Sequence, residues 1–472
     1  MQKVYKEVAT LDKKAYEDFA LSEDLLMENA ALALKKKILK IAKKKHNILI
    51  VCGKGNNGAD GLALARLLQG LFSRVDIYIP FGLSSKMALV QEKRAKLLAC
   101  NFVNDLKTCK YDVIVDCIFG SGLNKPLREE YLELLKKLNF MKAKKIACDV
   151  PSGIDEKGHL NGQVFKADFT ISMGAYKMSQ FGDNAKDFVG KVELGFLGLC
   201  EDKYMSETAK MFLLEKKDLS LPFRKTKNTN KGSFGHSCFV LGEKEGACIL
   251  SALASFAFGS GLVSVLSLDS DKKDAEKVLP LELMNVNEVP KNTTALALGM
   301  GLGKYPKDKL EKLLRLDIKK VFDADLFYKK EIIDFFDDSD LVLTPHPKEF
   351  TSLLKLAKLA DIGVEELQDN RFFYLEKFTK KYPKLCILLK GANTLIAKNN
   401  TIYLNTLGSA VLSKGGSGDI LAGMIASLLA QGQDNLSACI NASLAHTLAG
   451  KKFKKNSYAL SPKDLIKGIK IL

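Results

Sequence analysis

The sequence predicts an α/β protein of two domains, each built around a mainly parallel β-sheet. Its 472 residues exceed the usual size of a single domain. Short apolar runs alternate with helix-like segments, and the runs end in polar or glycine-rich turns. Such alternation predicts doubly wound parallel sheets, in which ligands bind beyond the carboxyl ends of the strands.

Composition and charge narrow the classes of function. Hydrophobic residues make up 47% and charged residues 27%, as in globular proteins, and no apolar run is long enough to suggest a membrane span. The net charge of +17 is compatible with nucleic acid or small anions as partners. The lysines, however, are spread along the chain without a basic tail or interleaved aromatic residues. We therefore expect a solvated, lysine-rich surface that attracts small anions, and neither a nucleic-acid nor a membrane partner.

The cysteines and the N-terminus indicate a cytoplasmic protein. The ten cysteines form no CxxC pair, and several, such as Cys52, Cys117, Cys148 and Cys386, lie in apolar runs. We interpret them as buried thiols in a reducing compartment, not as disulfides or zinc ligands. The first residues also lack the apolar core of a signal peptide.

The first half has the alternating pattern throughout. A helix is expected over residues 22–45, with Ser22 as its N-cap and lysines at its end. Strands are expected at 47–52, 74–80, 112–119 and 145–150, and further helices at 62–71, 86–100 and 127–138. Three polar turns, at 53–61, 116–126 and 149–153, follow strands, so we expect them to meet at one edge of the sheet.

These turns supply amides, hydroxyls and carboxylates. Gly53, Gly55 and Gly58 meet the pattern GxGxxG, which is weak evidence alone, since ordinary turns and helix caps also contain it. Backbone amides of such loops can hold phosphate. Oxygen ligands such as Asn57, Asp116 and Ser152 suit an alkali or alkaline-earth cation better than zinc.

A second α/β domain follows a charge-rich interruption at residues 196–233. We place the boundary near 205–225 and assign residues 1–210 and 211–472 to the two domains. Strands are expected at 236–242, 262–268, 294–298, 320–322, 341–343 and 385–389, and helices at 247–259, 418–431 and 434–450. No repeat relates the two halves at residue level, so we expect two different α/β domains.

The stretch Gly-Gly-Ser-Gly-Asp at residues 415–419 precedes an apolar, helix-like run. Glycines let the backbone approach a ligand closely, and the amides and dipole of a helix N-terminus favour an anion there. Asp419 beside such a turn suits a general base that deprotonates a hydroxyl during phosphoryl transfer. Taken alone, the stretch is equally compatible with a simple helix cap.

Two further turns of the second half are weaker signals. Lys390-Gly391 after a strand can hold a nucleotide phosphate, and His346 lies in a stiff turn between two prolines, where it is as readily structural. The sequence has no GxxxxGK[ST] motif, which excludes a P-loop enzyme.

The motifs together resemble two known families. The motifs at 53–61, 115–122 and 149–153 resemble the YjeF N-terminal family, the NAD(P)H-hydrate epimerases, so the first domain is expected to be Rossmann-like. The motifs at 299–303, 322–325, 343–347, 389–394 and 415–419 resemble the ADP-dependent NAD(P)H-hydrate dehydratases, a branch of the ribokinase-like superfamily. The two resemblances cover nearly the whole chain in order, and their fusion is itself the pattern of bifunctional nicotinamide nucleotide repair proteins.

The resemblance implies that the first domain interconverts the R and S hydrates of NADH and NADPH. It implies potassium on Asn57, Asp116 and Ser152, and Asp149 is the candidate for proton transfer. The implied substrate residues are Asn56, Asn57, Gly58, Ala59, Asp60, Gly120, Ser121, Gly122, Leu123, Asn124, Lys125, Pro126 and Asp149.

For the second domain, the resemblance implies ADP-dependent dehydration of the S hydrate, with Mg²⁺ screening the phosphates. Asp419 would deprotonate the ring hydroxyl, which attacks the β-phosphoryl group of ADP, and elimination of phosphate would restore the dihydronicotinamide and leave AMP. The implied hydrate-binding residues are Ala247, Gly301, His346 and Asp419. The implied ADP-binding residues are Lys390, Gly391, Ala392, Asn393, Thr394 and Gly418.

The sequence departs from the family patterns at three places. Gly-Ala-Asp at residues 58–60 replaces Gly-Gly-Asp, which requires a negative φ at Ala59. Met300 replaces a proline, and Ser413-Lys414 adds a cation before the catalytic loop. The alternative function is a ribokinase-like small-metabolite kinase fused to a non-catalytic Rossmann-like binding domain. In either case we expect a homo-oligomer.

Overall fold

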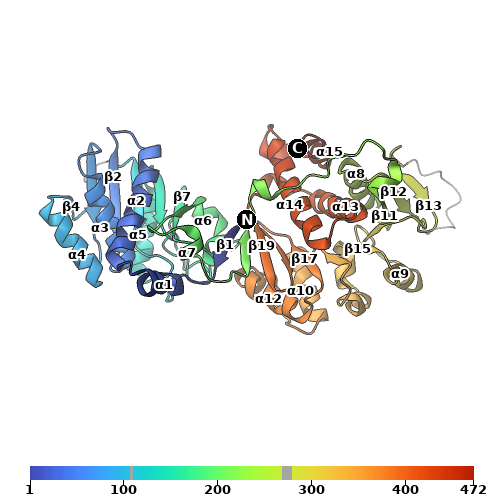
Figure 1. The fold of residues 1–472 in the computed structure, drawn as a ribbon, viewed down its shortest axis with the longest axis horizontal. Helices are drawn as coiled ribbons and strands as arrows, with labels where there is room; N and C mark the ends of the chain where they lie inside the picture. The colour runs from blue at the N-terminus through green and yellow to red at the C-terminus, as the bar shows by residue number, and fades with distance from the viewer. Residues whose placement is uncertain (107–109, 268–278) are drawn as a thin grey trace. The chain divides into compact units, whose positions relative to one another are not determined.

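The computed structural model describes residues 1–106, 110–267 and 279–472. The chain forms two compact units, one of residues 2–210 and one of residues 211–472 with Met1 (Figure 1). Both are α/β units with largely parallel sheets, as expected. Leu268, the last residue of the strand expected at 262–268, lies outside the described residues.

The sheet of the first unit is entirely parallel in its described part. Its strands lie in the order β4-β3-β2-β5-β6-β7-β9. They are β2 (Asn47–Cys52), β3 (Arg74–Tyr78), β4 (Asn101–Val103), β5 (Val113–Cys117), β6 (Lys144–Cys148), β7 (Phe169–Met173) and β9 (Lys191–Gly195). The chain leaves β2 toward β3 and β4 and returns to β5 on the other side. The region between the carboxyl ends of β2 and β5 is therefore the topological switch point, where such sheets bind ligands.

Helices flank this sheet, and a short pair of strands lies beside it. The helices are α1 (Ala9–Phe19), α2 (Glu23–Ile41), α3 (Asn56–Leu68), α4 (Lys86–Leu97), α5 (Glu129–Phe140), α6 (Lys186–Val189) and α7 (Glu201–Tyr204). The strands β1 (Gln2–Tyr5) and β8 (Tyr176–Lys177) pair in parallel. The four expected strands of this half are confirmed to within two residues at each end, whereas β4, β7 and β9 were not predicted.

Two helices begin or end away from their predicted bounds. The Ser22 side chain caps α2 as expected, accepting a hydrogen bond from the Leu25 amide, but the helix ends at Ile41, before the lysines at 43–45. Helix α3 begins at Asn56 rather than near Leu62, so residues 56–60 form its first turn, not a free loop. A glycine is needed at Gly58 because a Cβ there would lie 1.9 Å from the Gly53 carbonyl oxygen.

The second unit has a longer sheet that mixes both strand directions. Its strands lie in the order β13-β12-β11-β14-β15-β16-β17-β18-β19-β10. They are β10 (Met211–Leu213), β11 (His236–Val240), β12 (Leu262–Leu266), β13 (Met284–Val286), β14 (Ala295–Leu298), β15 (Lys319–Phe322), β16 (Leu341–Leu343), β17 (Cys386–Leu389), β18 (Thr394–Lys398) and β19 (Thr401–Asn405). Among these strands of the described chain, only β18 runs antiparallel to its neighbours. The strands β10, β13, β18 and β19 were not predicted.

Helices cover this sheet too. They are α8 (Glu245–Ala257), α9 (Lys307–Leu314), α10 (Pro347–Leu356), α11 (Val364–Asp369), α12 (Arg371–Lys381), α13 (Ser417–Ala430), α14 (Asn435–Lys452) and α15 (Pro462–Ile469). Helix α13 is buried along nearly its whole length and packs on α8, where Gly423 lets the helices approach: a Cβ there would lie 2.0 Å from the Ser251 carbonyl oxygen. The expected helices at 247–259, 418–431 and 434–450 are confirmed, but α15, not the third of them, ends the unit.

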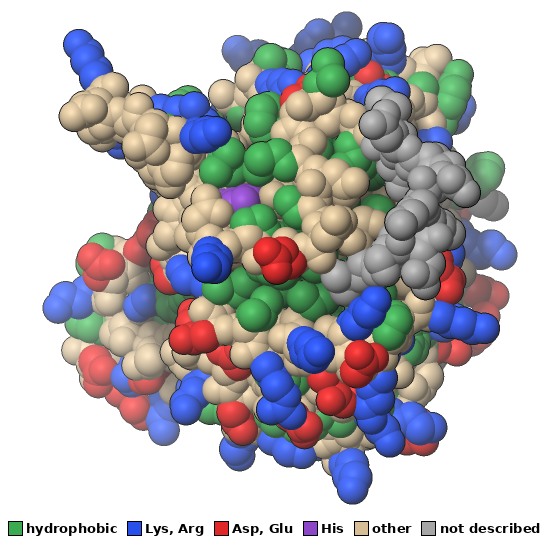
Figure 2. Space-filling view, turned by 90° about the vertical axis from the view of Figure 1, so that its right-hand side faces the viewer, with side chains coloured by type: hydrophobic (Ala, Val, Ile, Leu, Met, Phe, Trp, Pro, Cys, Tyr) green, Lys and Arg blue, Asp and Glu red, His purple; other side chains and the backbone are tan. Residues whose placement is uncertain are grey.

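The surface agrees with the expected charge pattern. On the face shown in Figure 2, the described Lys and Arg side chains are scattered among Asp and Glu and form no continuous basic area. Within the described part of the chain, no helix is both long and apolar enough to cross a membrane.

Candidate active sites

A cavity of about 450 Å³ lies at the switch point of the first unit. This volume is in the range of small-molecule sites. Its wall contains most of the predicted epimerase residues, namely Asn56, Asn57, Asp60, Gly120, Ser121, Gly122, Leu123 and Asp149. Gly58 and Ala59 are buried in α3 behind the wall, and Asn124, Lys125 and Pro126 are exposed and outside it.

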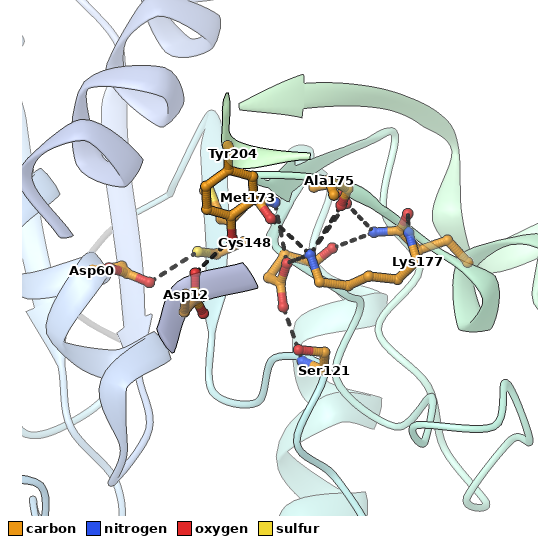
Figure 3. A network of polar contacts seen from close by, with 11 residues as sticks. Asp12, Asp60, Ser121, Cys148, Met173, Ala175, Lys177 and Tyr204 are labelled. Carbon is orange, nitrogen blue, oxygen red and sulfur yellow. Dashed lines mark hydrogen bonds and ion pairs between the residues drawn. The ribbon is translucent and has the colours of Figure 1, made fainter. Parts of the chain in front are cut away.

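Asp149 is the most tightly held carboxylate of this cavity, through contacts with Lys177, Met173 and Ser121, which Figure 3 labels. It directly follows β6 with a φ of +67°, an unusual conformation for a residue with a side chain. Its Oδ1 lies 2.6 Å from Lys177 Nζ and accepts a hydrogen bond of 3.1 Å from the Met173 amide. Its Oδ2 accepts one of 3.0 Å from the Ser121 amide. Three donors from three segments therefore fix this carboxylate.

Two further carboxylates face the same cavity from other elements. Burial raises the pKa of Asp60 well above its usual value, and the charges of Asp149 and Asp12 raise it further. Burial also raises the pKa of Asp12, although Asp12 Oδ1 accepts a 2.5 Å hydrogen bond from the Tyr204 hydroxyl. The cavity therefore combines a cation-paired carboxylate at Asp149 with a carboxyl at Asp60 that favours its protonated form.

The proposed potassium ligands adjoin the cavity and have suitable chemistry. Ser152 donates to Asp116 through both its amide (2.8 Å) and its hydroxyl (2.7 Å). Burial raises the pKa of Asp116 to about 6, against the effect of these hydrogen bonds. The Asn57 amide nitrogen is buried without a hydrogen-bond partner, so this side chain has unused polar capacity. One carboxylate, one hydroxyl and one amide fit an alkali cation. In the residues described, no group of three or more His, Cys, Asp or Glu could hold a metal.

In the second unit, Asp419 lies in the first turn of α13, and the backbone amides of a helix N-terminus can bind an anion. Gly416 precedes the helix with a φ of +88°, a left-handed conformation that favours glycine. Burial, with the charges of Asp323 and Glu349, raises the pKa of Asp419 to about 6, against the opposing effect of Lys390. At neutral pH Asp419 is thus mostly ionised but close to the pKa that suits a general base.

Lys390 connects the predicted nucleotide loop to Asp419. Its Nζ pairs with Asp323 Oδ1 at 2.7 Å, and a Cβ on Gly418 would lie 3.3 Å from the same nitrogen. Burial alone would lower the pKa of Lys390, but Asp323 and Glu349 raise it above its usual value, which keeps the amine protonated. A cation is therefore present beside the amides of α13.

The loop at residues 390–394 is supported from behind by Arg371, which the sequence did not predict. Arg371 is buried and donates to the carbonyl oxygens of Asn393 (3.0 Å) and Lys390 (3.0 Å). Within the loop, Gly391 and Ala392 are exposed, Asn393 is buried and Thr394 begins β18. His446, also unpredicted, lies 3.0 Å from the Ser417 carbonyl oxygen, and burial lowers its pKa to about 4, so it is neutral.

The predicted hydrate-binding residues of this unit lie on elements near Asp419. The Ser251 hydroxyl bonds to the carbonyl oxygens of both Ala247 and Asp419, which links α8 to α13. Gly301, with a φ of +62°, accepts a hydrogen bond from the Lys244 amide just before α8. His346 caps α10 and lies 3.0 Å from Glu349 Oε1, and the charge of Glu349 acts on Asp419.

The site residues that the sequence did not predict were missed for a common reason. Asp12, Lys177, Arg371 and His446 stand outside every glycine-rich or strand-end motif, so no local signal marks them. Asp323 is the exception, because it directly follows the strand β15 in the predicted motif at 322–325.

Comparisons with known proteins match both units of the chain. The family described as YjeF-related protein N-terminus matches residues 23–179, and the family described as NAD(P)H-hydrate dehydratase matches residues 238–470. A Helicobacter pylori protein, the bifunctional NAD(P)H-hydrate repair enzyme Nnr, is 46% identical over 481 residues, covering 100% of both chains. The Coxiella burnetii protein of the same name is 31% identical over 95% of this chain and 93% of its own.

Among solved structures, the ADP/ATP-dependent NAD(P)H-hydrate dehydratase from Bacillus subtilis, co-crystallised with ATP and Mg²⁺, is 24% identical with a TM-score of 0.46. The match covers 55% of this chain and 96% of that chain. The two family matches occur in the same order as the two units, and the relatives from Helicobacter and Coxiella span both units. The chain belongs to the family of bifunctional NAD(P)H-hydrate repair enzymes.

Proposed function

We propose that the first unit epimerises the R and S hydrates of NADH and NADPH, and that the second unit dehydrates the S epimer with ADP. The observation that carries this proposal is the presence of two separate polar sites, one per unit, each with an aspartate held by opposite charge or by helix amides. The relatives' activity in hydrate repair supports the assignment.

Epimerisation requires that C6 of the hydrated nicotinamide ring lose and regain its configuration. Asp149 accepts the proton of the C6 hydroxyl, the C6–N1 bond breaks and its electron pair goes to N1, and the hydroxyl becomes an aldehyde. Because the aldehyde carbon is planar, N1 can close on its other face, and the proton returns to the oxygen. Asp60, which favours its protonated form, is placed in the same wall to donate a hydrogen bond to the leaving N1 or to the oxygen.

The remaining groups of the first site bind and orient. The backbone of residues 120–123 and the amides of Asn56 and Asn57 line the cavity, where they can hold the nucleotide. Potassium held by Asn57, Asp116 and Ser152 would add a fixed positive charge beside this loop. The proposed contacts of Gly58, Ala59, Asn124, Lys125 and Pro126 would have to be made through the backbone or after closure of the loop on substrate.

Dehydration in the second unit uses ADP to turn a poor leaving group into a good one. Asp419 takes the proton of the C6 hydroxyl, whose oxygen attacks the β-phosphorus while the bond to the α-phosphate oxygen breaks and releases AMP. The C6–O bond then breaks, phosphate leaves, and loss of a proton from C5 forms the C5–C6 double bond. The amides at Gly418 and the Lys390 ammonium stabilise the charge of the transferring group.

Residues around this centre have binding roles. The loop of Lys390, Gly391, Ala392, Asn393 and Thr394 holds ADP, with Arg371 fixing its carbonyl groups. Ala247, Gly301 and His346 face the hydrate. Bound Mg²⁺ would screen the phosphate charges.

The products formed from purified S hydrate and ADP test this function. We expect NAD(P)H, AMP and phosphate in equal amounts, and retention of an ¹⁸O label on C6 during epimerisation without ADP. A stable phosphorylated product would instead favour the small-metabolite kinase, and complete exchange of the label with water would exclude the ring-opening route.

A cytoplasmic location and a homo-oligomeric state are part of the proposal. The free cysteines of the described chain, most of them buried, support a reducing compartment. Sedimentation of the full chain at micromolar concentration tests the oligomer, which a monomeric mass would exclude.

A further inference from the structure

We propose that Lys177 is a positioning residue of the epimerisation site, which holds the Asp149 carboxylate in the orientation needed for proton transfer. This inference rests on the function proposed for Asp149 above. Lys177 belongs to none of the motifs that identify the site, but it lines the same cavity. It reaches Asp149 from β8, a strand that follows β7 through a short turn.

The Lys177 ammonium is almost completely withdrawn from solvent. Its side chain is 1% exposed, and its Nζ contacts the carbonyl oxygens of Met173 (2.8 Å) and Ala175 (3.1 Å) and the Ser172 hydroxyl (3.4 Å) besides Asp149 (2.6 Å) (Figure 3). A buried cation is tolerated only when it is paired and hydrogen-bonded. Because the other three acceptors are neutral, the charge of this buried amine is balanced locally by Asp149.

The ion pair with Lys177 makes the two carboxylate oxygens of Asp149 different from each other. Lys177 and the Met173 amide both act on Oδ1. The other oxygen, Oδ2, accepts a hydrogen bond from the Ser121 amide, and it lies beside Gly120, where an added Cβ would be 3.1 Å away. Both Gly120 and Ser121 line the cavity. Lys177 therefore keeps Oδ1 occupied and leaves Oδ2 as the oxygen nearest the loop that faces the substrate.

The surroundings of Asp149 make this cation necessary. Nearby ionisable groups include Asp60, Asp12 and the Tyr204 hydroxyl, and none of these three can carry a positive charge that would balance Asp149. Without Lys177, the Asp149 carboxylate would keep its two amide donors but lose its counter-charge and one of the two contacts on Oδ1, so it would no longer be held in this orientation. Removal of Lys177 should thus slow the chemical step while leaving most substrate contacts intact.

Lys37 provides a matched control in the same unit. It is also buried, at 7% exposed, and its Nζ pairs with Glu193 Oε1 at 3.0 Å. It is absent from the wall of the cavity. Lys37→Met removes the same charge and a similar ion pair, so it measures the effect of losing a buried lysine as such.

The experiment uses the full chain with the substitutions Lys177→Arg, Lys177→Met and Lys37→Met, assayed with pure R hydrate. We expect Lys177→Met to lower the epimerisation kcat about 100-fold with KM changed less than about threefold, since misplacing a reacting group has effects of this size. Lys177→Arg keeps the charge but moves the donors, and we expect a loss of about tenfold. Dehydration of S hydrate in the same samples should stay normal, as should epimerisation by Lys37→Met.

Three results would overturn the inference. One is an unchanged epimerisation kcat in Lys177→Arg, a variant that retains the buried charge and so does not depend on tolerance of an unpaired carboxylate. Another is a loss of epimerisation kcat in Lys37→Met that equals the loss in Lys177→Met. The third is a rise in KM that accounts for the whole effect. Asp149→Asn distinguishes failure of this inference from failure of the role proposed for Asp149. If Asp149→Asn is inactive in epimerisation while the Lys177 variants are normal, only the inference about Lys177 fails. If Asp149→Asn remains active, the role proposed for Asp149 fails as well.

Discussion

At the scale of single residues, the proposed role of Asp419 as a base makes dehydration in the second site depend on pH. Burial, Asp323 and Glu349 raise the pKa of Asp419 to about 6, so a proton must leave before it can act as a base. Activity should therefore be lost on the acid side, where the carboxyl group is protonated.

We predict that kcat/KM for dehydration falls about tenfold per pH unit below about pH 6, the region in which Asp419 is protonated in the free enzyme. Glu349→Gln removes a negative charge that raises this pKa, so the acid limb should move to lower pH. The measurement is a pH–rate profile with S hydrate and ADP. Glu365→Gln, an exposed change of the same charge on α11, should leave the limb in place. An acid limb that moves to higher pH in Glu349→Gln would contradict this electrostatic account.

The sequence predicted residues that stand in motifs and missed those that support them. Asp149 and Asp419 follow a strand or precede a helix in glycine-rich stretches, so chain position alone suggested their chemistry. Lys177 is 28 residues beyond Asp149, and Arg371 lies on a helix that precedes the loop it holds. Contacts of this kind depend on how β7, β8 and α12 return to the site, which no local pattern encodes.

At the scale of elements, the first turn of α3 explains how an alanine is accommodated in the first site. Ala59 is buried inside the helix and is not among the residues with positive φ, as the sequence required. The neighbouring Gly58 has no room for a side chain, because its Cα faces the Gly53 carbonyl oxygen.

We predict that Ala59→Gly lowers the stability of the first unit by about 1 kcal/mol, the cost of glycine inside a helix. Gly58→Ala should cost more, because its Cβ would overlap the Gly53 carbonyl oxygen at 1.9 Å. Gly55→Ala serves as the control: nothing lies within 4 Å of its Cβ position and its φ is −97°, so we expect only the loss of a favoured N-cap residue, about 1 kcal/mol or less. Denaturant unfolding of the three full-length variants measures this order, and Gly58→Ala as stable as Gly55→Ala would contradict it.

Element prediction succeeded where the apolar pattern was continuous. Buried parallel strands such as β2, β5 and β11 contain runs of apolar residues and are bounded by turns, and they were found close to their observed positions. The short strands β4, β10 and β13 have three residues each and are only partly buried, whereas β16, which is equally short and was predicted, is fully buried. Helix α3 was placed too late because its first turn, Asn-Asn-Gly-Ala-Asp, has the composition of a loop.

At the scale of the whole molecule, two α/β units of different topology each have a polar site at the carboxyl ends of their strands. The first has a cavity lined by four carboxylates and one buried lysine, and the second has a helix N-terminus with an aspartate and a lysine. These two sets of groups suit different chemistry, since proton transfer alone can invert the hydrate, whereas removal of its oxygen needs a phosphoryl donor. The account therefore requires two independent sites that act in series on one substrate.

The measurement that tests this claim most directly supplies pure R hydrate and ADP to the full chain and to two variants, and follows R hydrate, S hydrate and AMP over time. Wild type should convert all R hydrate to NAD(P)H. Asp419→Asn should accumulate S hydrate without AMP, and Asp149→Asn should consume R hydrate no faster than buffer alone. An equimolar mixture of the two variants should restore full conversion, because the S hydrate diffuses from one protein to the other. Conversion of R hydrate by Asp149→Asn at the wild-type rate, or failure of the mixture, would contradict the account.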